Sequence, residues 1–402
     1  MSEYIWVIGT YDTKWNELDF VIHILRKSQY QVLSVDVSTT EHDRSVDITA
    51  VEIAGCHPFR KNFLKDNSGR GDAVACMSEA LANFMDTRSP KGVIGLGGSG
   101  GTALVCSGLR TLPVGIPKVM VSTVASGQVA PYVGASDIMM LYSITDIAGI
   151  NQISHKILGN AAHALLGMVT RELTEFESDK ALLGMTMFGV TTKGVNQIRS
   201  RLEQDYEILI FHATGTGGQS MEKLIGSGLI DWVIDMTTTE ICDLFMGGIM
   251  SAGETRMDAI LARKIPYLLS LGAMDMVNFG AIDTVPDQYK DRLLYKHNPQ
   301  VTLMRTSLEE NRMMGSWIAA KLNTSKAPVR LFIPEKGISA LSVEGQPFHD
   351  PSADQALFEV LKKEIIQNDD RQIISLPYSI NDEAFTKVVV DEFRNLVLKT
   401  VH

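Results

Sequence analysis

Short, continuously apolar runs alternate with helical stretches along the whole chain, and this alternation restricts the fold more than any other feature. The clearest runs are residues 4–8, 91–96, 117–122, 231–236, 265–272, 329–335 and 372–378. Runs without a polar alternation are typical of parallel strands that are covered on both faces by helices. The sequence therefore predicts an α/β fold with largely parallel sheets.

The same strand, turn, helix and strand pattern occurs twice. In the first half it comprises a strand over residues 4–8, a turn over 9–14, a helix over 17–25 and a strand over 31–37. In the second half a strand at 182–189 is followed by the turn VTTKG, a helix at 195–202 and a strand at 207–211. These are βαβ units. We predict two Rossmann-like subdomains that are related by internal duplication.

The boundary between the halves is expected in the polar stretch 174–180, after a long helical segment at 153–173. This gives a first subdomain at 1–178, which would bind the nucleotide, and a second at 179–402. A length of 402 residues also fits two domains of about 150 residues or more each. Residues 40–68 are irregular, and we expect a long loop there.

The sharpest motif is GLGGSGGT at residues 95–102, which lies directly between an apolar strand and a helical run. Glycines let the backbone approach a ligand, and the free amides of the following helix start attract an anion such as phosphate. The alternative is that the glycines only permit tight packing of the helix on the sheet. The candidate ligand residues here are Gly97, Gly98, Ser99, Gly100 and Thr102.

A nicotinamide site would also need an acidic residue at the end of the next strand. That strand ends instead in Ser122 and Thr123. The difference favours a mononucleotide or another phosphorylated ligand over NAD. The loop at 122–127 either extends the polar cradle or is a plain turn.

The first turn is a second candidate, because ligands of open α/β sheets bind at the carboxyl ends of the strands. Thr10, Asp12, Thr13 and Lys14 cluster there. Lys14 could neutralise a phosphate, and Asp12 could bind magnesium directly or through water. A helix N-cap beside a solvated lysine is the alternative. Asp36, which ends the second strand, could hold a ribose or could simply begin a polar turn.

The second half repeats the glycine turn as HATGTGGQS at residues 212–220. Either two lobes use such turns, or only one copy kept its site. Glu240 could be a general base, a metal ligand or the acid of a capping box. Arg256 could clamp an anion or form a structural salt bridge. His212 and His297 are acid–base candidates, although a structural role is more common for isolated histidines.

Composition excludes several classes of protein. A net charge of −10 disfavours nucleic acid as a partner. No basic leader precedes the first apolar run, and no run approaches the roughly 20 residues of a membrane-spanning helix. The four cysteines, at 56, 76, 106 and 242, show neither disulfide nor zinc spacing. We expect a cytoplasmic protein without a membrane partner, and neither a zinc site nor a catalytic nucleophile with a named partner can be assembled from the sequence.

The chain resembles the ATP-binding domain family of the tomato mosaic virus resistance protein, which also occurs in bacteria and fungi. The resemblance covers about residues 3–395 and rests on the strings GTYDTK, GVIGLGGSGGT, GIPKVMVSTVASG, FGVTTKGV, FHATGTGGQSMEKL, DMTTTE and MVNFGA. It implies paired Rossmann-like subdomains, ATP with Mg²⁺ and a homodimer, and the plant member binds a viral replication protein. The barrel-like C-terminal domain of the plant member has no counterpart in this sequence.

Carried onto this chain, the resemblance implies a nucleotide site that agrees with the one chosen from the motifs. Its residues would be Thr10, Asp12, Thr13, Lys14, Gly97, Gly98, Ser99, Gly100, Thr102, Ser122 and Thr123. We therefore expect a protein that binds ATP and Mg²⁺ and acts as a nucleotide-dependent enzyme on a small metabolite. Two alternatives stay open: a non-catalytic, nucleotide-regulated protein-binding module, and a sugar-acid isomerase or lyase in which Glu240 or His212 moves protons.

Overall fold

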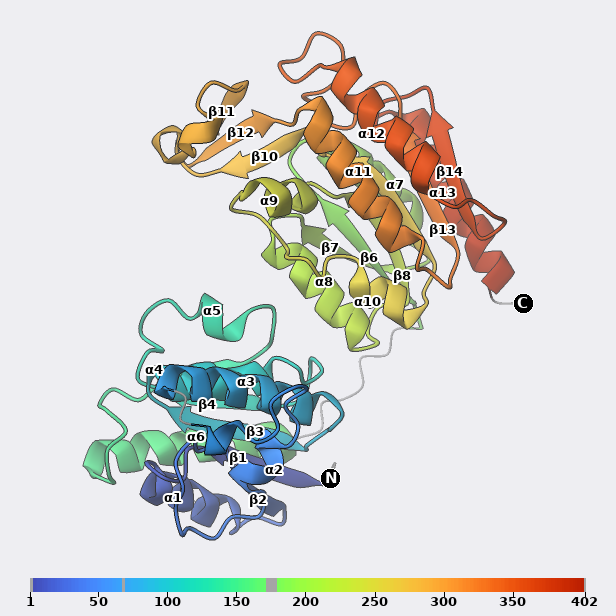
Figure 1. Ribbon diagram of the computed structural model, residues 1–402. Helices are drawn as coiled ribbons and strands as arrows, with labels where there is room; N and C mark the ends of the chain where they lie inside the picture. Colours follow the sequence, from blue (N-terminus) through green and yellow to red (C-terminus); the bar gives the residue numbers. More distant parts are fainter. Residues whose placement is uncertain (1–2, 67–68, 171–178, 401–402) are drawn as a thin grey trace. The chain divides into compact units, whose positions relative to one another are not determined.

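The computed structural model describes residues 3–66, 69–170 and 179–400, and the chain divides into two compact units. Unit 1 comprises Met1–Phe176 and unit 2 comprises Glu177–His402 (Figure 1). The polar stretch in which the sequence places the boundary lies almost entirely outside the described residues. Each unit has its own sheet and its own hydrophobic cores.

Unit 1 is built on a five-stranded sheet in the order β2-β1-β3-β4-β5, in which every pair is parallel. Gly9 pairs with Asp36, and Gly97 pairs with Ser122, so the predicted ligand residues all lie along the carboxyl edge. The continuous apolar runs thus form buried parallel strands, as predicted. The strands are β1 (Tyr4–Gly9), β2 (Gln31–Asp36), β3 (Gly92–Gly97), β4 (Lys118–Ser122) and β5 (Met139–Tyr142).

Helices cover both faces of this sheet (Figure 1). On one face α1 (Trp15–Leu25) and α6 (Gln152–Thr170) pack against alternate strand residues such as Val7 and Ile94. The other face is covered by α2 (Ala50–Ala54), α3 (Arg70–Asp86) and α4 (Ser99–Leu109). The short elements η1 (Phe63–Lys65) and α5 (Ala130–Val133) lie in connections. The expected long loop at 40–68 thus contains α2 and η1.

Unit 2 contains a six-stranded parallel sheet in the order β14-β13-β9-β8-β6-β7. Read from β7, its first five strands follow the order of the unit 1 sheet, and β14 is added beyond them. The common order is what a duplicated fold would have. The strands are β6 (Leu182–Met187), β7 (Glu207–His212), β8 (Trp232–Thr237), β9 (Tyr267–Gly272), β13 (Val329–Pro334) and β14 (Arg371–Leu376).

The unit 2 helices also form two layers (Figure 1). One layer consists of α7 (Thr192–Leu202) and α13 (Glu383–Thr400). The other consists of α8 (Thr216–Gly226), α9 (Glu240–Met246), α10 (Asp258–Arg263), α11 (Leu308–Leu322) and α12 (Pro351–Glu364). Both layers place apolar side chains on the sheet, which explains why its strands are predominantly apolar.

A small antiparallel sheet was not predicted. It has the order β10-β12-β11 and lies between β9 and α11 in the chain, with the short helices η2 (Ile282–Thr284) and η3 (Asp287–Tyr289) beside it. Its strands are β10 (Met276–Phe279), β11 (Leu294–Asn298) and β12 (Val301–Arg305). They mix polar and apolar residues, so they lack the apolar runs that revealed the parallel strands.

The sequence shows no run long enough for a membrane-spanning helix and no disulfide spacing among its cysteines, and the structure can be compared with both observations. Across the described residues, none of the helices combines the length and the apolar character that crossing a membrane requires. All four cysteines carry free thiols.

A buried ion pair joins α12 to the antiparallel sheet. Arg305 Nη2 donates to Asp354 Oδ1 at 2.6 Å, and both side chains are almost inaccessible to solvent. Burial raises the pKa of Asp354 from its ordinary value of 3.8 to about 7, and the negative charge of Asp275 acts in the same direction against the opposing effect of Arg305.

This pKa predicts the pH dependence of stability in unit 2. The unfolded chain loses the Asp354 proton near pH 3.8, whereas the folded chain keeps it to about pH 7. Because the folded state binds more protons in this interval, its free energy of unfolding falls as the pH rises through it. Asp354→Asn keeps the acceptor oxygen but cannot titrate, so the fall should become shallower. Hydrogen exchange of α12 at a series of pH values measures this fall in the free energy of unfolding. If the free energy changes with pH equally steeply in Asp354→Asn and in the unchanged protein, the pKa assigned to Asp354 is contradicted.

Candidate functional site

The strand order of unit 1 determines where a ligand is most easily bound. In sheets of the order 2-1-3-4-5, the connections leave β1 and β3 toward opposite faces, and a crevice forms outside their carboxyl ends. A cavity of ≈ 610 Å³ lies there. It is lined by residues from the turn after β1 and from the glycine turn after β3, which the sequence analysis had selected separately: Thr10, Asp12, Thr13, Lys14, Gly97, Gly98, Ser99 and Gly100.

The glycine turn exposes backbone donors to this cavity. Helix α4 begins at Ser99, and none of the described side chains caps it. Its first intrahelical donor is the amide of Thr102, which bonds to the carbonyl of Gly98 at 2.8 Å. The amides of Ser99, Gly100 and Gly101 have no acceptor within the described part of the chain. Such a helix start attracts an anion through both its free N–H groups and its dipole.

Packing explains two of the glycines in the motif at 95–102, since a Cβ atom on Gly95 would lie 2.5 Å from Val105 Cγ1 of α4. A Cβ atom on Gly97 would lie 2.9 Å from the backbone of Gly101, so this position must be glycine. At Gly98 the nearest atom would be Thr123 Oγ1 at 3.7 Å, and at Gly100 nothing lies within 4 Å. A glycine within a helix costs up to about 1 kcal/mol relative to alanine. Glycines that packing does not require are therefore best explained by the close approach of a ligand.

Three of the predicted residues lie beneath or beside the turn and do not line the cavity. Thr102 Oγ1 donates to the Gly98 carbonyl at 2.8 Å and is 2.6 Å from Ser122 Oγ, and both side chains are fully buried. The amide of Thr123 donates to the Gly97 carbonyl at 3.3 Å. These contacts fix the shape of the turn from below.

The turn after β1 presents one carboxylate oxygen without a partner. The amide of Asp12 donates to Ser38 Oγ at 3.0 Å, and its Oδ1 atom is buried without a hydrogen bond to any described residue. Thr10 Oγ1 and Thr13 Oγ1 lie 2.9 Å apart, and Lys14 Nζ donates to the Ile147 carbonyl. The turn thus offers hydroxyl and carboxylate oxygens beside an ammonium group.

Asp36 has a different position from the other predicted residues. Its Oδ1 atom accepts hydrogen bonds from the amide of Tyr11 at 3.3 Å and from the amide and hydroxyl of Ser38 at 2.9 and 2.5 Å. Its Oδ2 atom is 2.9 Å from His42 Nε2. Both oxygens are engaged within the protein, where they join the loops that follow β1 and β2. Ribose binding by Asp36 stays a prediction.

Burial also fixes the phenol of Tyr11. The hydroxyl donates to the Val7 carbonyl at 3.0 Å, and burial, with a further contribution from the charge of Asp36, raises the pKa of Tyr11 well above its ordinary value. Tyr11 is therefore a neutral anchor of the turn after β1.

The sequence analysis missed three polar residues that line the cavity: Thr39, Thr40 and Arg70. Arg70 is exposed and begins α3, where the helix dipole disfavours a cation. That unfavourable placement is a signal that could have identified it. With Lys14, Arg70 gives the cavity two cations against the single carboxylate of Asp12.

The glycine turn of unit 2 binds an internal carboxylate. Glu240 Oε1 accepts hydrogen bonds from the amides of Gly215 and Gly218 at 2.8 and 3.0 Å. Glu240 Oε2 accepts one from Arg256 Nε at 2.9 Å. Burial raises the pKa of Glu240, and Arg256 partly opposes this. A Cβ atom on Gly218 would lie 2.2 Å from Glu240 Oε2, so here the glycine is needed for the contact with the carboxylate.

Arg256 continues this buried cluster. Its Nη2 atom is 2.8 Å from Asp235 Oδ2, and its Nη1 atom is 3.4 Å from Glu222 Oε1. Tyr267 donates its hydroxyl to Asp235 at 2.6 Å. Burial raises the pKa of Glu222, which the charge of Arg256 partly offsets. Arg256 therefore forms a structural salt bridge, the second of the two roles considered. Both carboxylate oxygens of Glu240 accept hydrogen bonds from protein groups.

The two histidine candidates lie elsewhere. His212 is exposed at the end of β7, with its ring centroid 6.1 Å from that of Phe188, and His297 is exposed in β11. Neither residue lines the unit 1 cavity. Proton transfer by either residue stays a prediction.

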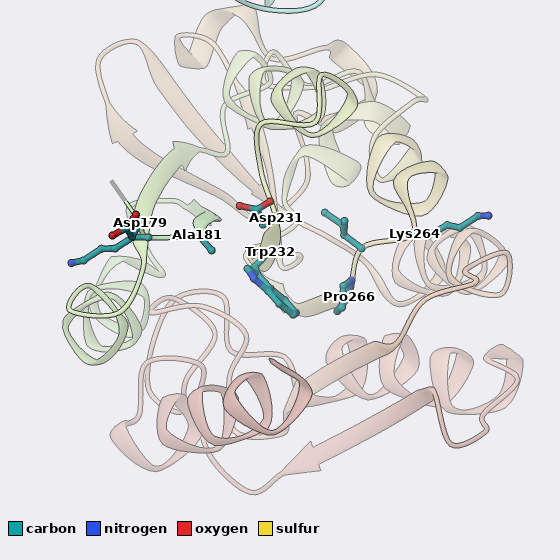
Figure 2. A pocket seen from close by; sticks show the side chains of 8 residues that line it. Asp179, Ala181, Asp231, Trp232, Lys264 and Pro266 are labelled. Atoms are coloured by element: carbon teal, nitrogen blue, oxygen red, sulfur yellow. The ribbon is translucent and has the colours of Figure 1, made fainter. Parts of the chain in front are cut away.

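A wide depression of ≈ 560 Å³ at the opposite, amino edge of the unit 2 sheet is a weaker candidate. Figure 2 shows Asp179 and Lys264 on opposite sides of it, with Trp232 and Pro266 between them. Asp231 Oδ2 accepts a hydrogen bond from the amide of Leu182 at 3.0 Å, which is a structural contact. Ligands of α/β sheets bind at the carboxyl edge, so we do not assign a function to this depression.

The two glycine turns predict opposite responses to the same substitution. Gly100→Ala adds a methyl group to open space, so it should leave the stability of α4 unchanged or raise it by up to about 1 kcal/mol. Gly218→Ala places its methyl group on the Glu240 carboxylate and should destabilise α8 by about 1–3 kcal/mol or more. Hydrogen exchange resolves each helix. Equal effects at the two positions would contradict the distinction between an open turn and an internally bound one.

The fold and this cavity define a class of two-unit α/β proteins. In this class the first unit presents free amides and two cations in the crevice outside the carboxyl ends of β1 and β3. The chain belongs to the uncharacterised protein family UPF0261. The N-terminal domain of that family matches residues 3–174, and its C-terminal domain matches residues 180–397.

Relatives cover nearly the whole chain. A UPF0261 protein of Rhizobium meliloti (strain 1021) is 49% identical over 393 residues, which cover 98% of each chain. A UPF0261 protein of Clostridium tetani is 46% identical over 407 residues, covering 99% of this chain and all of that protein. The tomato (Solanum lycopersicum) ToMV resistance protein Tm-1(GCR237) is 43% identical over 427 residues, covering all of this chain and 57% of the tomato protein. The resemblance to the tomato resistance protein is therefore confirmed as a family relationship, and ATP binding stays a prediction.

Solved structures add little. UDP-N-acetylglucosamine 2-epimerase from Rickettsia bellii covers 99% of this chain and 96% of its own, with 12% identity and a TM-score of 0.23. A likeness at this level supports no inference about function.

Proposed function

We propose that the cavity of unit 1 binds a nucleoside triphosphate together with Mg²⁺, and that ATP is this nucleotide. The observation that carries the proposal is the uncapped start of α4, where three backbone amides and two glycines without packing constraints face the cavity. The choice of ATP rests on the family resemblance, because the cavity itself selects only for phosphate.

The charges of the cavity suit a polyphosphate. The amides of Ser99, Gly100 and Gly101 would donate to phosphate oxygens, as helix starts do in other phosphate sites. Lys14 and Arg70 would supply positive charge from the two sides of the cavity. The chain as a whole carries a net charge of −10, so two cations in one cavity represent a local reversal of the average charge.

The residues also fit a magnesium ion that arrives with the nucleotide. Mg²⁺ usually keeps several waters and is bound through one or two carboxylates together with the phosphates of the substrate. Asp12 Oδ1, which has no partner among the described residues, would provide the carboxylate, and the hydroxyls of Thr10 and Thr13 lie in the same turn. In the described ranges, no group of three or more acidic, histidine or cysteine side chains is placed so that it could hold a metal ion by itself, and a metal held largely by the ligand needs no such group.

Substituting a glycine of the turn tests this proposal. Gly98→Val adds no contact closer than 3.7 Å at its Cβ atom, and its branches should block the approach of a phosphate. We expect affinity for ATP·Mg²⁺, measured by calorimetry, to fall more than 100-fold. The matched control is Gly167→Val in α6 of the same unit, where nothing lies within 4 Å of the added Cβ atom. Unchanged affinity in a folded Gly98→Val protein overturns the proposal.

The proposal has two forms, an enzyme and a regulated binding module. Phosphoryl transfer needs mainly positioning, positive charge and a metal, all of which the cavity can provide, so an enzyme acting on a small metabolite is the first form. The residues described as lining the cavity include no histidine, cysteine or glutamate, which favours the second form. The tomato relative is by name a resistance protein, and a binding function would agree with that name.

Turnover separates the two forms. An enzyme should convert ATP to ADP by transferring the γ-phosphoryl group either to water, which releases phosphate, or to an acceptor, which becomes phosphorylated. Gly98→Val should abolish this turnover. A binding module should retain bound ATP unchanged over hours, as followed by phosphorus NMR of the nucleotide. ATP retained intact in the presence of a broad metabolite panel would contradict the enzyme form and leave the binding form.

A further inference from the structure

A second cavity, of ≈ 730 Å³, lies at the carboxyl edge of the unit 2 sheet. Its walls come from the segments that follow three strands: Gly189 and Lys193 follow β6, Lys336 and His349 follow β13, and Asn381 follows β14. This is the edge at which parallel sheets bind ligands. The cavity is separate from the glycine turn of unit 2 that Glu240 occupies, and neither the sequence motifs nor the family match assigns it a role.

Part of the wall repeats the turn that forms the unit 1 site. GVTTK at residues 189–193 corresponds to GTYDTK at 9–14, and each turn follows the first strand of its unit and ends in Thr-Lys. Lys193 is thus the counterpart of Lys14. Lys193 is exposed, and a Cβ atom at Gly189 would have nothing within 4 Å. The duplicated fold therefore places a lysine at equivalent edges, whereas the open glycine belongs to unit 2 alone, since a Cβ atom on Gly9 would lie 2.8 Å from Leu18.

Hydrogen bonds hold the walls of this cavity together. Asn381 Nδ2 donates to the Val190 carbonyl at 2.9 Å, and Asn381 Oδ1 accepts from the amide of Gly194 at 2.9 Å. The amide of Ala340 donates to the same Val190 carbonyl at 3.0 Å. The segments after β6, β13 and β14 are therefore joined, so the cavity is built into the fold and is not a gap between independent loops.

The lining carries charges of both signs: two lysines, Lys193 and Lys336, and three carboxylates, Glu335, Glu344 and Asp382. Lys193 and Lys336 have no ion-pair partner within the part of the chain that the structure describes. By contrast, Glu335 pairs with Lys362 at 3.2 Å. Asp382 Oδ2 accepts the amide of Ser379 at 2.8 Å.

Two further groups complete the lining. Nδ1 of His349 lies 3.0 Å from the Ser342 carbonyl, which leaves its Nε2 atom for a ligand. Glu344 is the remaining carboxylate, and no partner for it is found among the described residues. The cavity thus offers two ammonium groups, an imidazole nitrogen and two carboxylates, Glu344 and Asp382, that have no cationic partner among the described residues.

We propose that this cavity binds a small carboxylate that also carries hydroxyl or amino groups. The two lysines would hold the carboxylate through charge-assisted hydrogen bonds, and Glu344 and His349 would bond to the hydroxyl or amino groups. A polyphosphate is the poorer fit, because the amides of the neighbouring glycine turn already bind Glu240 and the free Glu344 repels additional negative charge. The inference does not depend on nucleotide binding in unit 1.

The test uses the full chain and three named probes, D-gluconate, L-tartrate and L-glutamate, with D-glucose as the uncharged comparison. We expect at least one carboxylate to bind in calorimetry or saturation-transfer NMR, and glucose not to bind. The double variant Lys193→Gln and Lys336→Gln should weaken that binding at least about tenfold, the size expected for lost hydrogen bonds to charged groups. Affinity for ATP·Mg²⁺ should not change, because the substitutions lie in the other unit.

The matched control removes two exposed lysines of unit 2 that lie outside the cavity, Lys326→Gln and Lys363→Gln. This variant has the same change in net charge and should retain the affinity of the unchanged protein. The proposal is overturned if none of the three carboxylates binds, if glucose binds equally well, or if the two double variants lose affinity to the same extent.

Discussion

A backbone amide at the start of a helix needs an acceptor, and the functional account of this protein depends on how each unit meets that need. Parallel strands that lead directly into helices bring such amides to the carboxyl edge of each sheet. In unit 2 the acceptor is the protein's own Glu240 carboxylate. In unit 1 the amides of another such turn, at Ser99–Gly101, face a cavity lined by Lys14 and Arg70. This turn follows β3, the counterpart of β8, whereas the turn that binds Glu240 follows β7, the counterpart of β2. The same local geometry thus leads to a structural contact in one unit and to a binding surface in the other.

Binding of the Glu240 carboxylate by the glycine turn has structural requirements in unit 2. Burying a carboxylate is expensive unless charge and hydrogen bonds compensate for the lost solvation. Arg256 supplies the charge and is itself surrounded by Asp235 and Glu222, so one contact with the glycine turn requires a buried cluster of ionisable groups. That cluster fixes α8 against the sheet and occupies its amides. Any ligand of unit 2 must therefore bind by other groups, and the cavity beside Lys193 and Lys336 offers them.

Much of this could be predicted from the sequence because it depends on local patterns. Continuous apolar runs identified the parallel strands, and strands that lie parallel bring their carboxyl ends to one edge. This is why the turns at residues 10–14 and 97–100 could be expected to lie close together, and both line one cavity. The family followed from long matching strings and is confirmed by relatives that are 43–49% identical.

Other features depend on contacts between distant residues, which no local pattern reveals. Nothing near Glu240 indicates that it reaches an amide 25 positions away, or that Asp36 engages Tyr11 at the same separation. Thr102 and Ser122 were predicted as ligand residues, and only the structure shows that they lie beneath the turn and do not line the cavity. The antiparallel sheet was missed because its strands lack apolar runs.

A crystal structure of the protein with ATP and Mg²⁺ tests the central claim most directly. The account predicts phosphate oxygens at about 3 Å from the amides of Ser99–Gly101, with the Glu240 carboxylate still bound to the turn at Gly215. Phosphates bound away from the α4 start, or a nucleotide that displaces Glu240 in unit 2, would contradict it.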